Sequence, residues 1–423
     1  MANPLFRRLA GLGGLTAAAP ILGYQLSAFG LVRTGSPYLF ADLVNRYQID
    51  PLYWGTAVTG TGAVAHVAAQ SAISVLCGAN SGTAKLETHE HYRYQAGKAT
   101  RWLMTGYSSD TGNTRSVREW GQFTASDGVF FRHARATAGN YLDLVIRTNT
   151  SGTPSNNAIA QSAWNVDKMD GTGPSHVTLD PTKGNIYEVT YQWLGVGEVI
   201  AMINGNVVHV QEHANTLAKP YMSTATLPMR VLVTEAGGSS GANGWTSICT
   251  AVYCEGGSDP ALYGFAYGRS AAPFALATTE TPLLSIRPAA TINSIENRRI
   301  IIPKHMTISA GSLSAGATTA TFKVYLNSAL TTGLAWTAVG GGSNAERDEG
   351  TTAAGFSAGT LIDVITIGDL DQRDYDFGNM FSLHGRKLML RDLATITQDL
   401  ITITCKLNAG TGTGSCDLVW VET

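Results

Sequence analysis

The fold of this chain is decided by QSAWNVDKMDGTGPSHVTLDPTKGNIYEVTYQWLGVGEVIAMINGNVVHVQEHAN, residues 161–215. The second half of this stretch is rich in β-branched and aromatic residues, which fit a pleated, half-buried surface. Asn204 and Gly205 separate two such runs, and both residue types tolerate the positive φ that a two-residue hairpin turn requires. With a further turn expected at Gly195 and Gly197, the pattern predicts consecutive antiparallel strands.

The first half of the stretch has a different composition. Trp164 and Met169 are large apolar residues surrounded by Asn, Asp, Gly and Pro. Residues of those four types at this density build compact turns rather than repeating structure. The sequence therefore predicts a fixed loop that packs its own tryptophan beside the sheet.

Several ordered motifs carry a resemblance to a known class of proteins. The run from Gln161 to Val199 is followed by HVQEHAN, by YMSTATLPMR at residues 221–230 and by SICTAVYCEGG at residues 247–257. With a lead-in from about Tyr92, this region resembles a module found in structural proteins of tailed bacteriophage particles. The resemblance implies a place in the virion and no enzymatic residues. It leaves open whether that place is the tail, a fibre or the capsid surface.

Composition limits the function classes. A length of 423 residues predicts two or three domains. Charged residues make up 14% of the chain, against roughly 25% in ordinary soluble domains. Low charge together with 47 glycines is typical of β-rich assembly proteins. A formal net charge of −2 provides no field that attracts nucleic acid, so no nucleic-acid partner is expected.

Short strand patterns continue on both sides of the central stretch. Four such patterns between residues 101 and 147 are spaced as in an antiparallel sandwich. The Trp193 strand followed by INGNVVH also resembles the back-sheet hairpin of concanavalin-like jelly rolls. We expect a concanavalin-like β-sandwich over residues 91–270 and a second, jelly-roll-like sandwich over residues 300–423. Residues 271–299 lack periodicity and are expected to form a connector.

The amino-terminal region, residues 1–90, is expected to be an extended arm and attachment region. After Arg8 the sequence is uncharged up to Val32, which is the outline of an export signal or a weak membrane span. Pro20 and five glycines make that run a poor helix, so we favour an arm ordered by neighbouring subunits and no membrane span. Leu39, Leu43 and Tyr47 follow at helical spacing and predict a short helix.

The sequence contains no convincing metal or catalytic site. His209 and His213 belong to an HxxEH pattern, but in an extended strand they lie roughly 13 Å apart, too far to share one zinc. The polar segments HEH at residues 89–91 and GDLDQRDYDFG at residues 368–378 are expected to be solvated. We therefore expect no catalytic residue, metal or cofactor, and a protein that is not an enzyme.

The five cysteines match no zinc pattern. Cys405 and Cys416 flank a predicted hairpin, which allows a cross-strand disulfide. Free buried thiols that act as small apolar side chains are the favoured alternative.

Two functions remain after these exclusions. One is a virion structural subunit that assembles as a homo-oligomer, most simply a trimer, with other particle proteins. The other is a lectin-like module that binds host surface glycan. Six aromatic residues are candidates for glycan or subunit contacts: Trp120, Trp164, Trp245, Tyr263, Phe265 and Tyr267. Buried tryptophans favour the scaffold, whereas an exposed tryptophan beside polar groups favours the lectin.

Overall fold

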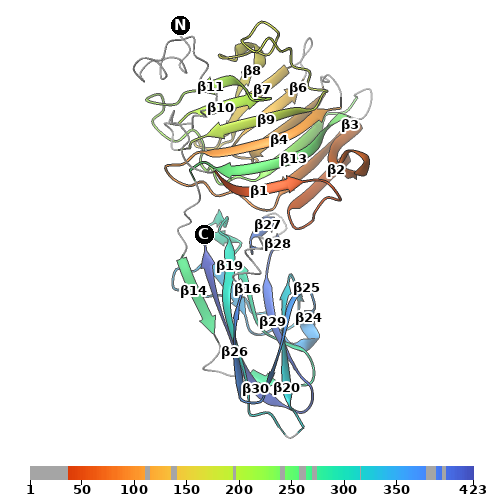
Figure 1. The fold of residues 1–423 in the computed structure, drawn as a ribbon, viewed down its shortest axis with the longest axis vertical. Helices are drawn as coiled ribbons and strands as arrows, with labels where there is room; N and C mark the ends of the chain where they lie inside the picture. Colours follow the sequence, from red (N-terminus) through yellow and green to blue (C-terminus); the bar gives the residue numbers. More distant parts are fainter. Residues whose placement is uncertain are drawn as a thin grey trace. The chain divides into compact units, whose positions relative to one another are not determined.

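The computed structural model describes residues 37–423 except 110–114, 135–140, 194–196, 239–242, 257–262, 269–273, 315, 378–386 and 393–396. The chain divides into two compact units, Met1–Asp259 (unit 1) and Pro260–Thr423 (unit 2), shown in Figure 1. The fold is nearly all β, as the sequence predicts. The described residues contain no helix that is long and apolar enough to cross a membrane. The expected arm up to Ser36 lies outside the described residues.

Unit 1 contains one antiparallel sheet of thirteen strands. They are β1 (Tyr38–Val44), β2 (Trp54–Val67), β3 (Ala72–Thr88), β4 (Thr100–Ser108), β5 (Ser116–Phe123), β6 (Gly128–Ala134), β7 (Tyr141–Thr148), β8 (Ser155–Ala160), β9 (Asn185–Tyr191), β10 (Val199–Ile203), β11 (Asn206–Gln211), β12 (Met229–Glu235) and β13 (Asn243–Cys254). One layer has the order β11-β10-β9-β4-β13, with β1 also on β13. The other has the order β3-β12-β5-β6-β7-β8, with β2 on β3.

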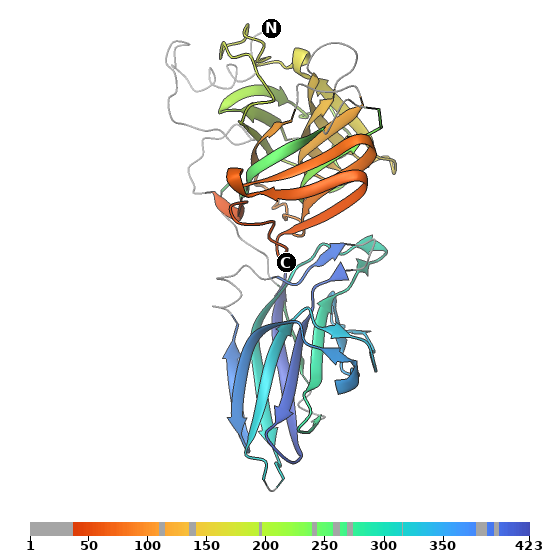
Figure 2. The ribbon, with the colours of Figure 1, turned by 90° about the vertical axis from the view of Figure 1, so that its right-hand side faces the viewer.

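The two layers of unit 1 face each other across an aromatic core. Figure 1 shows β9, β4 and β13 crossing in front of β6 and β7, and Figure 2 shows the long β2–β3 hairpin. Trp120 from β5 stacks on Trp245 from β13, with ring centroids 3.8 Å apart. It also meets Tyr187 from β9 edge-on at 4.9 Å. Strands that share no hydrogen bonds are therefore joined by buried rings.

The predicted hairpin is confirmed. Ile203 pairs with Asn206, which leaves Asn204 and Gly205 as the two turn residues. Their φ values of 52° and 79° are the positive pair that a type I′ turn needs. The turn expected at Gly195 lies outside the described residues.

The predicted helix at Leu39, Leu43 and Tyr47 is wrong. Residues Tyr38–Val44 form β1, which pairs antiparallel with β13. The spacing misled because four residues is also a multiple of the strand period, so the same residues share a face of a strand. A register shift between Leu39 and Ala41 then leaves Leu39 exposed while Leu43 enters the core.

The expected division of residues 1–90 from the sandwich is also not what the structure has. β1, β2 and β3 belong to the thirteen-stranded sheet, and β3 pairs with β12 and β13. These partners lie more than a hundred residues further along the chain. Pairing at such separations leaves no local signal in the sequence.

The described residues of unit 2 form two sheets and three two-stranded ribbons. Its strands are β14 (Tyr263–Gly268), β15 (Phe274–Leu276), β16 (Thr281–Pro288), β17 (Thr291–Ile292), β18 (Ile295–Glu296), β19 (Ile301–Gly311), β20 (Thr319–Leu326), β21 (Ala329–Leu330), β22 (Thr337–Ala338), β23 (Ala345–Asp348), β24 (Phe356–Ser357), β25 (Thr360–Gly368), β26 (Asp371–Asp376), β27 (Leu390–Asp392), β28 (Thr397–Gln398), β29 (Ile401–Leu407) and β30 (Gly412–Glu422). The first sheet has the order β14-β30-β19-β26, with β15 on β30, and the second has the order β22-β23-β16-β29-β20-β25.

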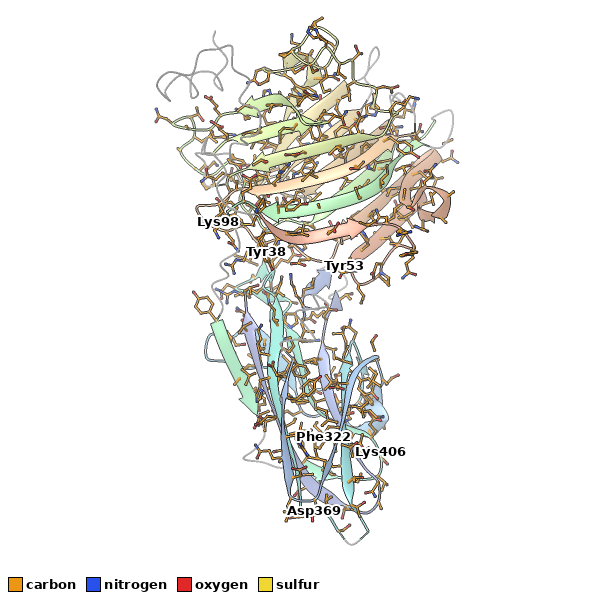
Figure 3. The ribbon with its side chains drawn as sticks, viewed as in Figure 1. Tyr38, Tyr53, Lys98, Phe322, Asp369 and Lys406 are labelled. Atoms are coloured by element: carbon orange, nitrogen blue, oxygen red, sulfur yellow. The ribbon has the colours of Figure 1, made fainter. Side chains whose placement is uncertain are left out.

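Alternation along the strands fills the core of unit 2. Phe322 of β20 lies opposite Cys405 of β29, and both are buried. The next pair, Thr321 and Lys406, points to the other face, and Figure 3 labels Phe322 and Lys406. Leu418 and Trp420 from β30 join the same core cluster, so the two sheets pack face to face.

The connector expected over residues 271–299 is partly wrong. It contains β16, which pairs with both β23 and β29 inside the second sheet. β16 contains Pro282, which lies near the start of the strand and next to a register shift. Proline is tolerated at those places because a ladder hydrogen bond is not needed there.

None of the five cysteines, all of which lie in described residues, forms a disulfide, so Cys405 and Cys416 are not cross-linked. Four of them are buried. Burial raises the pKa of Cys405 to about 12, so its thiol stays protonated and unreactive at neutral pH.

Candidate functional site

The three tryptophans that are candidates for glycan or subunit contacts lie in the core of unit 1. Trp120 is 0% exposed, Trp164 2% and Trp245 1%. Trp164 also donates its indole N–H to the carbonyl of Ile159 at 3.2 Å. Their interpretation as glycan contacts is therefore wrong, because none of these rings reaches the surface.

The other three candidates lie on β14, an edge strand that pairs with β30. Tyr263 is 61% exposed, whereas Phe265 packs against the core of unit 2. Tyr267 donates a hydrogen bond to Glu349, and the guanidinium of Arg347 lies 4.1 Å above its ring. The structure thus brings Tyr267 next to charged groups that the sequence did not connect with it.

His209 and His213 do not form a metal site. Nδ1 of His209 accepts the backbone N–H of Asn165 at 3.3 Å, and Nδ1 of His213 donates to the carbonyl of Gly197 at 3.0 Å. The ring of His213 also stacks on Tyr221 at 4.2 Å. Over the described ranges, no three His, Cys, Asp or Glu side chains gather as metal ligands would.

These two histidines predict a pH dependence of stability. Burial lowers the pKa of His209 and of His213 below their ordinary value of 6.5. Below about pH 6.5 these two histidines therefore bind protons in the unfolded chain that they do not bind in the folded chain. The free energy of unfolding falls as the pH drops through this range. Urea unfolding at pH 7.5 and pH 5.0 is expected to show a smaller loss for His213→Gln than for the unchanged chain. Equal losses of stability for the two proteins would show that His213 does not contribute to the pH dependence.

A charged patch covers the outer side of the second layer of unit 1. On each strand the alternate residues point inward, such as Leu86, Trp120 and Phe131. The residues between them form the patch, which we call the arginine face: Lys85, Glu87, Glu119, Arg132, Asp143, Arg147, Asn156 and Arg230. It spans six neighbouring strands, from β3 to β8.

Ion pairs hold the side chains of the arginine face in place. Nη2 of Arg132 lies 2.5 Å from Oδ2 of Asp143, and Arg230 pairs with Glu87. Arg147 contacts Oε1 of Glu119 at 3.2 Å and donates from Nε to Oδ1 of Asn156 at 2.8 Å. Burial lowers the pKa of Arg147 and the charge of Glu119 opposes that shift. An arginine stays protonated at neutral pH in any case.

Two stacked phenylalanines form a floor under these charges. The rings of Phe123 and Phe130 lie 4.3 Å apart, and the guanidinium of Arg147 is 4.7 Å from the centre of Phe130. Each phenylalanine faces a glycine across the strands. A Cβ on Gly128 would lie 2.1 Å from Cβ of Phe123, and Gly128 has a φ of 156°, so no side chain fits there. The glycines let the rings lie flat against the sheet.

The arginine face offers fixed donors and acceptors for a polar ligand. Arg132 is the most open of its arginines, with 24% of the side chain exposed, against 12% for Arg147. Guanidinium groups bind carboxylates through two parallel hydrogen bonds. The paired carboxylates accept hydroxyl groups. Sequence reasoning missed this patch because its members come from separate strands and carry no shared motif.

Comparisons with known proteins give a likeness in fold alone. No protein-family model and no curated protein matches the chain. The carbohydrate recognition domain of Emp47p is similar, with a TM-score of 0.35 and 12% identity over 52% of this chain and 96% of that one. An endo-β-1,4-glucuronan lyase from the fungus Trichoderma reesei has a TM-score of 0.36 and 11% identity over 51% and 95%. A structure titled for endo-acting O-glycanases of the human gut microbiota has a TM-score of 0.37 and 12% identity, over 51% of this chain and 98% of that one.

The prediction that the chain is not an enzyme does not stand. Two of the three structures are titled for glycan-processing enzymes. The prediction depended on the lack of a catalytic motif in the sequence. That argument is weak for a sheet such as the arginine face, where side chains from different strands meet without any common spacing.

Proposed function

We propose that the arginine face binds a glycan that contains acidic sugars. The observation that carries this proposal is the set of ion-paired side chains fixed over a phenylalanine floor. Four cationic residues (Lys85, Arg132, Arg147 and Arg230) meet three carboxylates (Glu87, Glu119 and Asp143). The face therefore has one surplus positive charge in a chain of net charge −2.

The geometry supports a carboxylate as the group that is recognised. Arg132 contacts a single oxygen of Asp143, through Nε at 3.1 Å and Nη2 at 2.5 Å. Its side chain is partly open to solvent, so a ligand carboxylate reaches it without a change in the sheet. A sugar ring held there donates hydroxyl groups to Asp143 and Glu119, whose oxygens are acceptors.

We further propose that the chain is a subunit of a tailed-bacteriophage particle and that this binding serves attachment to the host. The motifs of residues 161–257 and the low charge of the chain support this role. A homotrimer that contacts other virion proteins is the expected assembly. Mass spectrometry of purified particles tests the location, and analytical ultracentrifugation of the chain tests the trimer.

Glycan binding is tested with the full chain on an array that contains uronic-acid and sialic-acid oligosaccharides. Arg132→Gln is expected to weaken binding about tenfold, because a charge-assisted hydrogen bond contributes about 1.5–3 kcal/mol. Lys168→Gln is the matched control, since it removes one positive charge from an exposed position of the same unit. Released oligosaccharides, measured by chromatography, would reveal cleavage in addition to binding.

Two results would overturn the glycan proposal. One is the lack of binding to any acidic glycan by the unchanged chain. The other is equal binding by Arg132→Gln and Lys168→Gln. A thermal unfolding curve for each variant separates lost binding from lost folding.

A further inference from the structure

One tryptophan stands apart from the others. All eight tryptophans lie in the described residues, and seven of them pack into or against one of the two large cores. Trp336, in the segment that leads into β22, joins neither core and is partly exposed. Its indole N–H meets no acceptor in the part of the chain that the structure describes. A large aromatic side chain left at the surface is a common feature of binding sites.

The segment that carries Trp336 is held rigidly although nearly all of it is exposed. Residues 331–342 are exposed except for Trp336 and Val339. Near one end, the buried carboxylate of Asp348 accepts the backbone N–H of Ala335 at 2.6 Å. After the other end, the buried carboxylate of Glu422 accepts from the hydroxyl of Ser343 at 2.5 Å and from the N–H of Asn344. The side chain of Trp336 is thus presented from a fixed backbone.

An ion pair lies at the ring of Trp336, and its two charges cancel. The guanidinium of Arg287 lies 3.9 Å from the centre of the Trp336 ring and pairs with Glu346 at 2.8 Å. Arg347, the next residue of β23, points to the other face of the sheet and lies over the ring of Tyr267 instead. Arg287 and Glu346 together leave no net charge. The site has no electrostatic preference for an ionic ligand.

The composition of the segment argues against a protein partner. Besides the partly exposed Trp336, Leu334 is the one exposed large apolar residue of the segment, and the remaining members are chiefly Thr, Ala and Gly. Protein interfaces need a larger apolar centre and aromatic anchors in pockets. A sugar needs a smaller apolar surface than a protein partner does. One aromatic ring stacks on the C–H face of the sugar while nearby carboxylates and guanidinium groups bind its hydroxyls.

We propose that Trp336, Arg287 and Glu346 form a second carbohydrate site, on unit 2, for an uncharged hexose. Trp336 stacks on the sugar ring. Arg287 fixes the orientation of the indole and donates to a ring hydroxyl, and Glu346 accepts from another. This site does not depend on the arginine face, which differs in unit, in charge and in the sugar that it selects.

The test uses the full chain and three free neutral sugars, lactose, cellotriose and mannotriose, in saturation-transfer NMR. At least one of them is expected to receive magnetisation from the unchanged chain. Trp336→Ala is expected to raise its dissociation constant by about tenfold or more, because the ring that stacks on the sugar is lost. Trp336→Tyr keeps a ring and is expected to restore part of the binding. Leu370→Ala is the control, because it removes an exposed large apolar side chain of the same unit.

The outcomes separate this site from the arginine face. Trp336→Ala is expected to bind acidic glycans as the unchanged chain does, and Arg132→Gln is expected to bind the neutral sugar normally. The second site is refuted if none of the three sugars receives magnetisation at millimolar concentration, or if Trp336→Ala and Leu370→Ala behave alike. Neither result bears on the binding of acidic glycans at the arginine face.

Discussion

Replacing Trp120 with alanine is expected to lower the free energy of unfolding of unit 1 by about 4 kcal/mol. The side chain is fully buried and contacts rings from three other strands: Trp245 at 3.8 Å, Tyr187 at 4.9 Å and Phe131 at 6.2 Å. Removing it leaves a cavity between the two layers of the sheet. The surrounding strands are hydrogen-bonded on both sides and relax only slightly, so most of that cavity stays open.

Urea unfolding followed by circular dichroism measures this loss. Trp120→Phe is expected to lose less than the alanine variant because it keeps a ring in contact with Trp245. Val177→Ala is the control, since Val177 is 40% exposed in a loop of the same unit and its change is expected to stay within about 0.5 kcal/mol. A loss below about 1 kcal/mol for Trp120→Ala would mean that the rings do not join the layers.

Replacing Asp348 with alanine is expected to lower the free energy of unfolding of unit 2 by about 3 kcal/mol. The buried carboxylate accepts the backbone N–H groups of Ala335 at 2.6 Å, Thr351 at 3.2 Å and Gly350 at 3.3 Å. It also accepts the hydroxyl of Thr351. Without it these donors lose their acceptor, and leaving a buried donor unsatisfied costs more than a hydrogen bond contributes.

The Asp348→Ala variant also tests whether sugar binding at Trp336 depends on this carboxylate. Asp348→Ala frees the segment of Trp336 and is expected to weaken the neutral-sugar site more than Asp348→Asn, which keeps one acceptor oxygen. Asp374→Ala is the control, because Asp374 is 64% exposed and makes its hydrogen bond to Thr307 at the surface. Calorimetry of the three variants, together with the NMR titration, makes the comparison. Equal unfolding temperatures for Asp348→Ala and Asp374→Ala would contradict the anchoring role.

Local patterns in the sequence were sufficient for much of the fold. The Asn204-Gly205 turn, the strands around it and the alternation at Phe322 all follow from rules that act over a few residues. Non-local pairing is where prediction failed. The partner of β1 is a strand some two hundred residues later, so nothing near Leu43 distinguishes a strand from a short helix.

The candidate sites were less predictable than the fold. Trp120 and Trp245 drew attention because aromatic residues serve both cores and binding sites, and only burial decides between the two. Trp336 was missed, although an isolated tryptophan outside any apolar alternation was an available signal.

The position of β13 has a consequence for how unit 1 reaches its native state. This strand, at residues 243–254, hydrogen-bonds to β1, β3 and β4, which all precede residue 109. During synthesis those three strands leave the ribosome long before their common partner exists, and their unpaired edges are exposed meanwhile. Folds dominated by such distant contacts form slowly, on millisecond to second timescales. Unit 1 is therefore most vulnerable to aggregation in the interval before β13 has been synthesised.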